Sequence, residues 1–269
     1  MYKLIALDMD GTLLNHQKQV SPRNQAAIAA ARRQGVTVVL ASGRPLEGMS
    51  FFLEQLGMTS DDDYVICYNG ALVQRASDRQ VIRSQLLRGH DAHRVQTLAR
   101  ELGVNVHAFS RNLGLITPAI SHYTEHESRL NGLPITVIDF AELYPQDEIL
   151  KVMLIDPPEL LGPAISRLPA SLYEDYTVVQ SAPFFLEIMN KHSHKGAGVA
   201  ALAEHMGISR EQIICIGDAG NDSHMIEYAG LGIAMGNATD DLKALADHIT
   251  GMNDDDGVAQ AIEHFVLGR

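Results

Sequence analysis

Apolar runs and a helix-forming stretch alternate along the first forty residues of the chain. Residues 3–8 (KLIALD) and 36–42 (VTVVLAS) are continuous apolar runs, typical of strands buried on both faces. Residues 21–35 lie between them, with Ser21 as a suitable N-cap and Gly35 able to end a helix in a left-handed turn. The pattern predicts a strand, a helix and a second strand.

This unit decides where the polar side chains at the strand ends meet. A helical crossover of this length makes the two strands parallel and the connection right-handed. Asp8 and Ser42 follow the two strands, so we expect them at the same edge of one sheet. In open α/β sheets that edge, beyond the carboxyl ends of the strands, binds ligands.

The last seventy-five residues repeat the alternation, whereas the middle of the chain has denser turns. We expect helices at 195–207, 221–230 and 239–248, with strands at 213–217 and 231–236. Within 83–185 we expect strands at 104–110, 133–140 and 149–156, with helices at 90–103 and 158–168. The prediction is an α/β protein: a doubly wound, Rossmann-like parallel sheet core from residues 1–83 and 186–269, and an inserted α/β cap at 84–185.

Composition narrows the possible partners. The 269 residues carry 21 Lys and Arg against 33 Asp and Glu, a net charge of −12. Nucleic acids and anionic membranes need a basic face, so neither is expected as a partner. No apolar run is long enough for a membrane span and the N-terminus does not resemble a signal peptide, so a cytoplasmic location is expected. Cys67 and Cys215 lie in apolar runs and are expected to be buried free thiols.

Acidic residues follow the first predicted strand and another near the C-terminus. Asp8 and Asp10 alternate along an extended segment and face the same way, and Gly11 lets the chain turn afterwards. Asp218 and Asp222 lie in a second strand-to-helix loop. Like charges gathered this closely require a cation, and oxygen ligands without His or Cys indicate Mg²⁺. The plain alternatives are a surface turn and an N-cap cluster.

Two further motifs offer groups that bind anions. Ser42, Gly43 and Arg44 provide a hydroxyl and backbone N–H groups after the second strand, although Ser-Gly there is often only a turn. Lys195 opens a predicted helix, an unfavourable place for a cation unless an anion is near. Taken singly, Lys195 would more often be a solvated charge.

In order and context, these motifs resemble the haloacid dehalogenase superfamily of phosphotransferases. The segments DMDGTLL, ASGRP, YNGA, the EI before HKG, and GDAGNDSHMI are similar to those of Cof-type phosphatases with a large inserted cap, including a bacterial sugar phosphatase of comparable length. The resemblance covers essentially the whole chain. It implies a phosphatase of small phosphorylated metabolites, with sugar phosphates as the first choice.

The resemblance also implies roles for individual residues. Asp8 would be the nucleophile that forms an aspartyl-phosphate, and Asp10 the general acid and base. The remaining roles fall to residues of the other motifs. Mg²⁺ would be held by Asp8, Asp218 and the backbone carbonyl of Asp10; the phosphoryl oxygens by Lys195, Ser42, Asn221 and the N–H groups of Met9 and Gly43; and Asp222, Thr12 and Arg44 would support these groups.

Other functions stay open at this point. The substrate could instead be pyridoxal phosphate or a nucleotide, or the enzyme could be a phosphomutase that returns the phosphoryl group to its substrate. A phospho-accepting regulatory domain uses similar residues but lacks the D-x-D pair and the inserted cap. The sequence leaves a homodimer open and does not mark which cap side chains contact a substrate.

Overall fold

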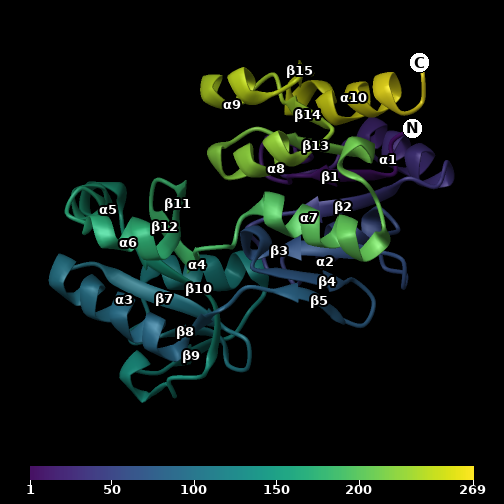
Figure 1. Cartoon of the computed structure of the whole chain (residues 1–269). Coiled ribbons are helices and arrows are strands. Elements are labelled where there is room, and N and C mark those ends of the chain that lie inside the picture. The colour runs from purple at the N-terminus through teal and green to yellow at the C-terminus, as the bar shows by residue number, and fades with distance from the viewer. The chain divides into compact units, whose positions relative to one another are not determined.

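The computed structural model describes residues 1–269, and the chain forms two compact units (Figure 1). The first unit comprises Met1–Ser84 and His194–Arg269, and the second comprises Gln85–Ser193. The predicted fold class, an α/β core with an inserted α/β unit, is confirmed. The second boundary falls at 194 rather than at 186, because residues 185–190 form a strand that pairs within the sheet of the inserted unit.

The first unit is built on an eight-stranded sheet with the order β15-β14-β13-β1-β2-β3-β4-β5. Pairing is parallel from β15 to β3 and antiparallel from β3 through β5. Its strands are β1 (Leu4–Leu7), β2 (Thr37–Ala41), β3 (Tyr64–Cys67), β4 (Leu72–Arg75), β5 (Val81–Ser84), β13 (Ile213–Gly217), β14 (Leu231–Ala234) and β15 (His248–Ile249). The antiparallel β4–β5 extension was not predicted.

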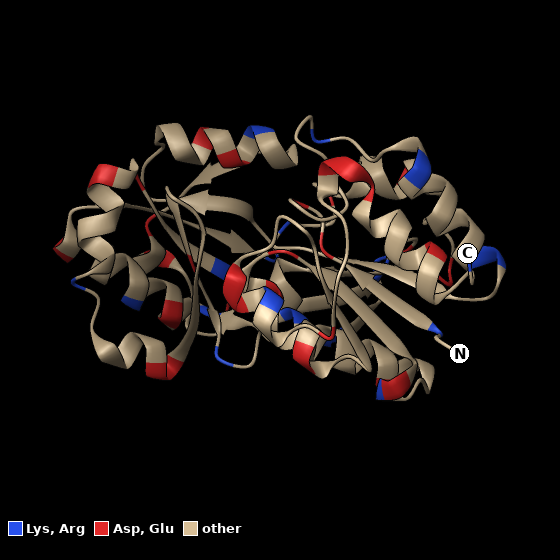
Figure 2. Ribbon diagram, turned by 90° about the horizontal axis from the view of Figure 1, so that it is seen from above, with Lys and Arg blue, Asp and Glu red and all other residues tan.

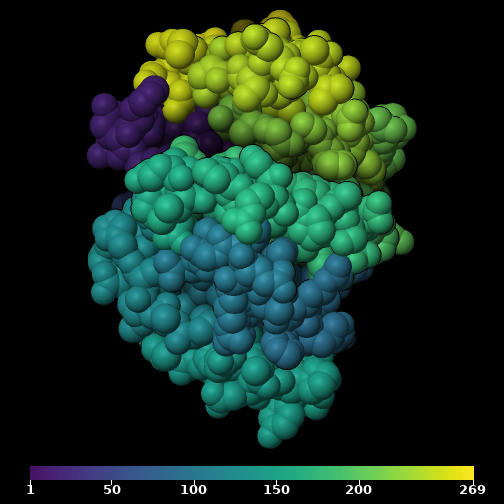
Figure 3. Space-filling model, turned by 90° about the vertical axis from the view of Figure 1, so that its left-hand side faces the viewer, coloured from purple at the N-terminus to yellow at the C-terminus, as the bar shows by residue number.

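Helices cover both faces of this sheet. They are α1 (Pro22–Arg33), α2 (Ser50–Gln55), α7 (Lys195–Met206), α8 (Ser223–Tyr228), α9 (Asp240–Leu245) and α10 (Gly257–Phe265), with 3₁₀ turns at Tyr68–Gly70, Arg210–Gln212, Gly220–Asp222 and Asn253–Asp255. Helix α1 packs against α10, and α7 packs against α8. The two chain ends therefore meet, and their purple and yellow surfaces adjoin in Figure 3.

The order of the strands locates a ligand-binding edge. Helix α1 leads from β1 to β2, whereas α8 leads from β13 to β14 in the opposite direction along the sheet. Right-handed crossovers in opposite directions put α1 and α8 on opposite faces and create a switch point between β1 and β13. Both strands are fully buried, which accounts for their unbroken apolar sequences. Asp8 and Asp218 follow them at this point.

The second unit contains a sheet with the order β11-β12-β10-β7-β8-β9, and β6 also pairs with β10. Its strands are β6 (Leu87–Arg88), β7 (Asn105–Ser110), β8 (Gly114–Thr117), β9 (Ile135–Val137), β10 (Glu148–Ile155), β11 (Tyr176–Ala182) and β12 (Phe185–Asn190). Its helices are α3 (Gly89–Leu102), α4 (His122–Asn131), α5 (Pro158–Ile165) and α6 (Ala170–Asp175), with a 3₁₀ turn at Phe140–Glu142.

The two faces of this second sheet differ in character. Val152 of β10 and Ile188 of β12 belong to the apolar cluster that packs against α3. Lys151 and Glu187 alternate with them on the same strands and form a buried ion pair at 3.1 Å. The expected strand at 133–140 is shorter than predicted, and the β11–β12 hairpin was missed.

Charged residues are scattered over the helices and loops of both units (Figure 2). No helix in the chain is both long and apolar enough to cross a bilayer. Cys67 and Cys215 are free and buried, as predicted. Burial raises the pKa of both thiols, which makes them unreactive.

Candidate active site

The turn after β1 packs tightly against the loop after β13. Gly11 has φ +87°, and a Cβ at this position would overlap the carboxylate of Asp218. Thr12, which is fully buried, donates its hydroxyl hydrogen bond to Asp218 at 2.8 Å. A residue with a side chain at position 11 would therefore separate the two loops that carry the acidic residues.

The side chain of Asp222 binds the backbone of its own loop, the one that follows β13. Its Oδ2 accepts hydrogen bonds from the backbone N–H groups of Asp218 (2.9 Å) and Ala219 (3.1 Å). A Cβ at Gly217 would lie 2.6 Å from this carboxylate, so the strand end must be glycine for the loop to close. The N-cap alternative is not what the structure shows for Asp222, because its carboxylate accepts from residues that precede it and makes no cap bond to α8.

Lys195 joins the two loops. It begins α7 and is fully buried, and its Nζ donates to Asp222 Oδ1 at 2.6 Å and to Asp8 Oδ1. Burial alone would lower the pKa of Lys195, but the carboxylates of Asp222 and Asp8 raise it above its ordinary value. Lys195 is therefore a charged group in the interior rather than a solvated cation.

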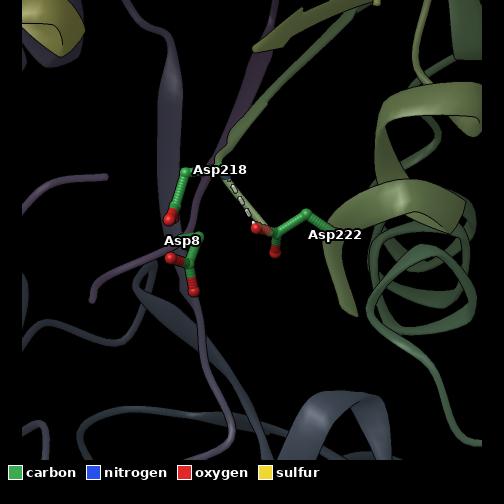
Figure 4. Close-up of side chains that lie close together, drawn as sticks. All are labelled: Asp8, Asp218 and Asp222. Atoms are coloured by element: carbon green, nitrogen blue, oxygen red, sulfur yellow. Dashed lines mark hydrogen bonds between the residues drawn. The ribbon is translucent and has the colours of Figure 1, made fainter. Parts of the chain in front are cut away.

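Asp8, Asp218 and Asp222 form a compact acidic cluster. Each offers a carboxylate oxygen, and these oxygens lie within 4.8 Å of one another. Figure 4 shows the carboxylates of Asp8 and Asp218 facing each other, with Asp222 bonded to the backbone of Asp218. Burial and the charge of Asp222 raise the pKa of Asp8 well above its usual range, and burial raises the pKa of Asp218. If ionised, the cluster carries two more negative charges than Lys195 balances.

Asp10 lies outside this cluster. Its carboxylate accepts hydrogen bonds from Arg44 Nε (2.9 Å), Arg44 Nη2 (2.8 Å) and Lys18 Nζ (2.7 Å). Burial would raise the pKa of Asp10, but these two cations hold it below its usual range. The two acids of the D-x-D pair thus have different partners and different charge environments, and only Asp8 belongs to the acidic cluster.

The loops after β2 and β3 are joined to the GDAGND loop. Asn221 donates to Asn69 Oδ1 at 3.1 Å, and the backbone N–H of Asn69 donates to the carbonyl of Ser42 at 2.9 Å. Ser42 is buried, and a Cβ at Gly43 would lie 3.2 Å from the Asn69 amide. Ser42, Gly43 and Asn221 thus lie in a continuous set of contacts centred on Asn69.

Three consecutive left-handed residues shape the loop after β3. Tyr68, Asn69 and Gly70 have φ of +50°, +52° and +92°. A Cβ at Gly70 would overlap the carbonyl oxygen of His194, directly before Lys195. His194 caps α7 by accepting a hydrogen bond from Ala197 N–H at its Nδ1, 3.1 Å away. This close approach fixes the start of the helix that carries the lysine.

Sequence reasoning assigned no role to Lys18 or Asn69. The YNGA segment is similar to a family motif, but nothing in the pattern marks Asn69 as a link between two loops. Lys18 lies in an ordinary polar stretch, and its position near Asp10 follows from a tight turn that periodicity does not reveal. The sequence did indicate that Asp8, Ser42 and Asp218 each follow a strand and that Lys195 begins a helix, all at one edge of the sheet.

The arrangement places a buried carboxylate, a fixed cation and a cluster of oxygen donors together. A carboxylate held by a buried ammonium can attack an electrophilic centre, and the neighbouring acids can hold a divalent cation. Backbone N–H groups at loop and helix ends can bind an anion there. These groups suit reactions of phosphate esters, in which an anionic group is transferred.

Known proteins with this organisation were found by sequence and by structure. A putative phosphatase from Bacillus subtilis, YxeH, is 42% identical over 271 residues and covers the whole of both chains. A second B. subtilis protein, the 5-amino-6-(5-phospho-D-ribitylamino)uracil phosphatase YcsE, is 32% identical over 98% of this chain and 96% of its own. The crystal structure of a haloacid dehalogenase-like hydrolase from Bacteroides thetaiotaomicron superposes with a TM-score of 0.85 at 33% identity, covering 98% of this chain and 99% of the other.

A family profile gives the same assignment. The profile of the haloacid dehalogenase-like hydrolases matches residues 5–262, which includes both parts of the first unit and all of the inserted unit. The resemblance inferred from the motifs is confirmed. The chain belongs to the haloacid dehalogenase-like hydrolases.

Proposed function

We propose that the protein is a magnesium-dependent phosphatase that hydrolyses phosphate monoesters of small metabolites through an aspartyl-phosphate on Asp8. One observation carries this proposal: the buried residues Lys195, Asp8 and Asp222 and the partly buried Asp218 lie together at the switch point of the sheet. Such a site supplies both a nucleophile and a way to accommodate phosphoryl charge.

The donor chemistry of the cluster fits Mg²⁺. The carboxylates of Asp8 and Asp218 face each other, and neither His nor Cys is among the donors. Binding of a divalent cation would favour the ionised form of these buried acids. Asp222 already accepts three hydrogen bonds from Lys195 and the loop backbone, so it is better placed to orient the site than to ligate. Asp8, Asp218 and the carbonyl of Asp10 would hold the ion. When bound, Mg²⁺ would offset phosphoryl charge as one anion approaches another.

In the first half-reaction, Asp8 attacks phosphorus. A bond forms between a carboxylate oxygen of Asp8 and the phosphorus, and the bond to the leaving oxygen breaks. Asp10 enters this step protonated, with one of its contacts to Arg44 and Lys18 released, and gives its proton to the departing alkoxide, which takes the electron pair of the broken bond. Lys195, Ser42, Asn221 and the N–H groups of Met9 and Gly43 bind the phosphoryl oxygens as their charge redistributes.

In the second half-reaction, Asp10 acts as a base. It takes a proton from a water molecule whose oxygen attacks the phosphorus of the aspartyl-phosphate. The bond from phosphorus to Asp8 breaks, its electron pair returns to the carboxylate, and inorganic phosphate leaves. The net reaction converts a monoester and water into an alcohol and phosphate.

Sugar and sugar-alcohol phosphates are the proposed substrate class. The relative YcsE is named for a substrate whose phosphate is carried by a ribityl chain, which is a polyol. We also propose that the inserted unit selects the substrate, because the acidic cluster and Lys195 lie in the first unit and a shared fold does not set the substrate. Pyridoxal phosphate and nucleotides remain competing substrates, and a phosphomutase remains a competing activity.

Phosphate release from a substrate panel tests this proposal. The panel contains sugar phosphates, polyol phosphates, nucleotides and pyridoxal phosphate, each assayed with Mg²⁺ and with chelator. We expect Mg²⁺-dependent release that is fastest for a sugar or polyol phosphate. Turnover only in the presence of a bisphosphate activator would indicate a mutase instead, and activity that survives chelation would contradict the magnesium requirement.

A further inference from the structure

The loop after β3 is held against the loop after β2 by backbone hydrogen bonds. Tyr68 N–H donates to the carbonyl of Arg44 at 3.2 Å, and Asn69 N–H donates to the carbonyl of Ser42 at 2.9 Å. Tyr68 and Asn69 are both left-handed, with φ of +50° and +52°. This conformation is unfavourable for tyrosine, and such strain persists only where the surrounding structure imposes it. Asn69 is only 2% exposed in the resulting loop.

The buried amide of Asn69 lies between two loops that carry proposed phosphoryl-binding groups. On one side, its Oδ1 accepts a hydrogen bond from Asn221 Nδ2 at 3.1 Å. On the other side, its Nδ2 would lie 3.2 Å from a Cβ at Gly43, so the amide packs directly on the Gly43 backbone. The Asn69 side chain is therefore shared between the loop after β2 and the loop that contains Asn221.

The hydrogen bond to Asn69 decides which end of the Asn221 amide can meet a phosphate. The oxygen and the nitrogen of a side-chain amide are similar in shape, but the oxygen only accepts hydrogen bonds and the nitrogen donates two. With Asn69 Oδ1 as acceptor, one Nδ2 hydrogen of Asn221 is used there and the second is left for a phosphoryl oxygen. Without that acceptor, the amide can rotate and present its own oxygen, which repels a phosphoryl group.

We infer that Asn69 is a positioning residue that orients the Asn221 amide for phosphoryl binding. This inference rests on the proposed function, in which Asn221 donates to a phosphoryl oxygen. Asn69 acts through Asn221, so its effect cannot exceed that of the Asn221 amide itself. Loss of one donor to transition-state charge lowers kcat by about 10²–10³-fold, which sets the upper limit.

The experiment is a double-mutant cycle on kcat/KM for p-nitrophenyl phosphate with Mg²⁺, using Asn69→Gly, Asn221→Ala and the double variant. Glycine at position 69 retains the left-handed backbone and the N–H that binds Ser42, so only the side chain is lost. We expect Asn221→Ala to lower kcat/KM by about 10²-fold and Asn69→Gly by about 10-fold. In the Asn221→Ala background, Asn69→Gly should change kcat/KM by less than about 2-fold.

Asn24→Ala is the control for loss of a buried amide. Asn24 Oδ1 accepts a hydrogen bond from Ala259 N–H at 2.9 Å, in the same unit. This variant should have a lower free energy of unfolding, measured with denaturant, and wild-type kcat/KM for the folded protein.

Each outcome bears on the inference. If Asn69 only supports the fold, Asn69→Gly lowers kcat/KM by the same factor with and without the Asn221 amide. That result, or wild-type kcat/KM in Asn69→Gly, would overturn the positioning role and leave the proposed function intact, provided that Asn221→Ala is impaired. Wild-type kcat/KM in Asn221→Ala would overturn the inference together with the phosphoryl-binding role of Asn221 in the proposed function.

Discussion

The ammonium of Lys195 and the carboxylate of Asp222 lie 2.6 Å apart, and both side chains are fully buried. Buried ion pairs contribute little net stability, since the cost of desolvating both charges offsets their attraction. The pair therefore needs a role other than stability, and the third partner supplies one, because Lys195 also donates a hydrogen bond to Asp8. Asp222 thus holds Lys195 against the proposed nucleophile.

Replacing Lys195 by Met should damage both the fold and the reaction. The substitution leaves two buried carboxylates without their cation, and loss of one partner of a buried pair costs about 3–5 kcal/mol. We expect a lower free energy of unfolding, measured with denaturant, and a fall in kcat of about 10²–10³-fold in the folded fraction. The control, Lys3→Met, removes an exposed lysine of the same unit. Wild-type kcat in Lys195→Met would exclude it from charge compensation.

Metal binding should be visible without any substrate. A ligand that binds only the folded state raises the thermal midpoint, and at 100 times its Kd the stabilisation is about 2.7 kcal/mol. We expect Mg²⁺ to raise the Tm of the wild-type protein and chelator to reverse the change. Asp218→Asn should abolish the shift, whereas Asp63→Asn, at an acid outside the cluster, should retain it. An equal Tm shift in Asp218→Asn would place the ion elsewhere.

Gly70 should tolerate no side chain. Alanine in the left-handed region costs about 1–2 kcal/mol, and at Gly70 a Cβ would also overlap the His194 carbonyl. Gly57 is the matched control, because it has φ +65° but a Cβ there would meet no atom within 4 Å. Gly57→Ala should show the strain alone, while Gly70→Ala should lose more stability and also kcat, since α7 begins at this contact. Equal stability losses for the two variants would contradict the close packing.

The stabilising effect of Asp63 should depend on pH. Burial would raise its pKa, but hydrogen bonds from Arg32 and Ser60 hold it below its usual value. A lowered folded-state pKa means that the stabilisation is present above the unfolded-state pKa of about 3.9 and disappears as the pH falls through the folded value.

Comparison of the wild-type protein with Asp63→Asn tests this sign. At pH 7 we expect the variant to be less stable by about 2 kcal/mol, because the charged hydrogen bonds are lost. The difference in free energy of unfolding should shrink as the pH falls below about 4, where the wild-type carboxylate becomes protonated. A difference that is constant from pH 7 to pH 3 would show that ionisation of Asp63 does not contribute.

The sequence predicted the elements whose pattern is local. Ser21 accepts the N-cap bond from Asn24 at 3.1 Å, and Gly207 ends α7 in the left-handed conformation, as capping rules indicate. Strands β1 and β2 pair in parallel, as the length of the crossover requires. The caps depend on neighbouring residues alone, and the parallel pairing depends on the one helical crossover that joins the two strands.

Features that depend on distant residues were not predicted. The β11–β12 hairpin was not predicted because Glu187 interrupts the apolar pattern of β12. Glu187 is nevertheless buried, since it forms an ion pair with Lys151 of β10. The contact between Lys18 and Asp10 and the link from Asn221 to Asn69 arise only when separate loops meet. Periodicity carries no information on such pairings, which is why the strand ends could be predicted and the contacts between them could not.

Chemical trapping of the intermediate tests the central claim most directly. Enzyme turning over a sugar phosphate with Mg²⁺ is quenched and treated with borohydride, which reduces an aspartyl-phosphate to homoserine, and peptides are mapped by mass spectrometry. The account predicts homoserine at position 8, dependent on substrate and Mg²⁺ and absent in Asp8→Asn, whose kcat should fall by about 10⁴-fold or more. Homoserine at another acid, or substantial turnover by Asp8→Asn, would contradict it.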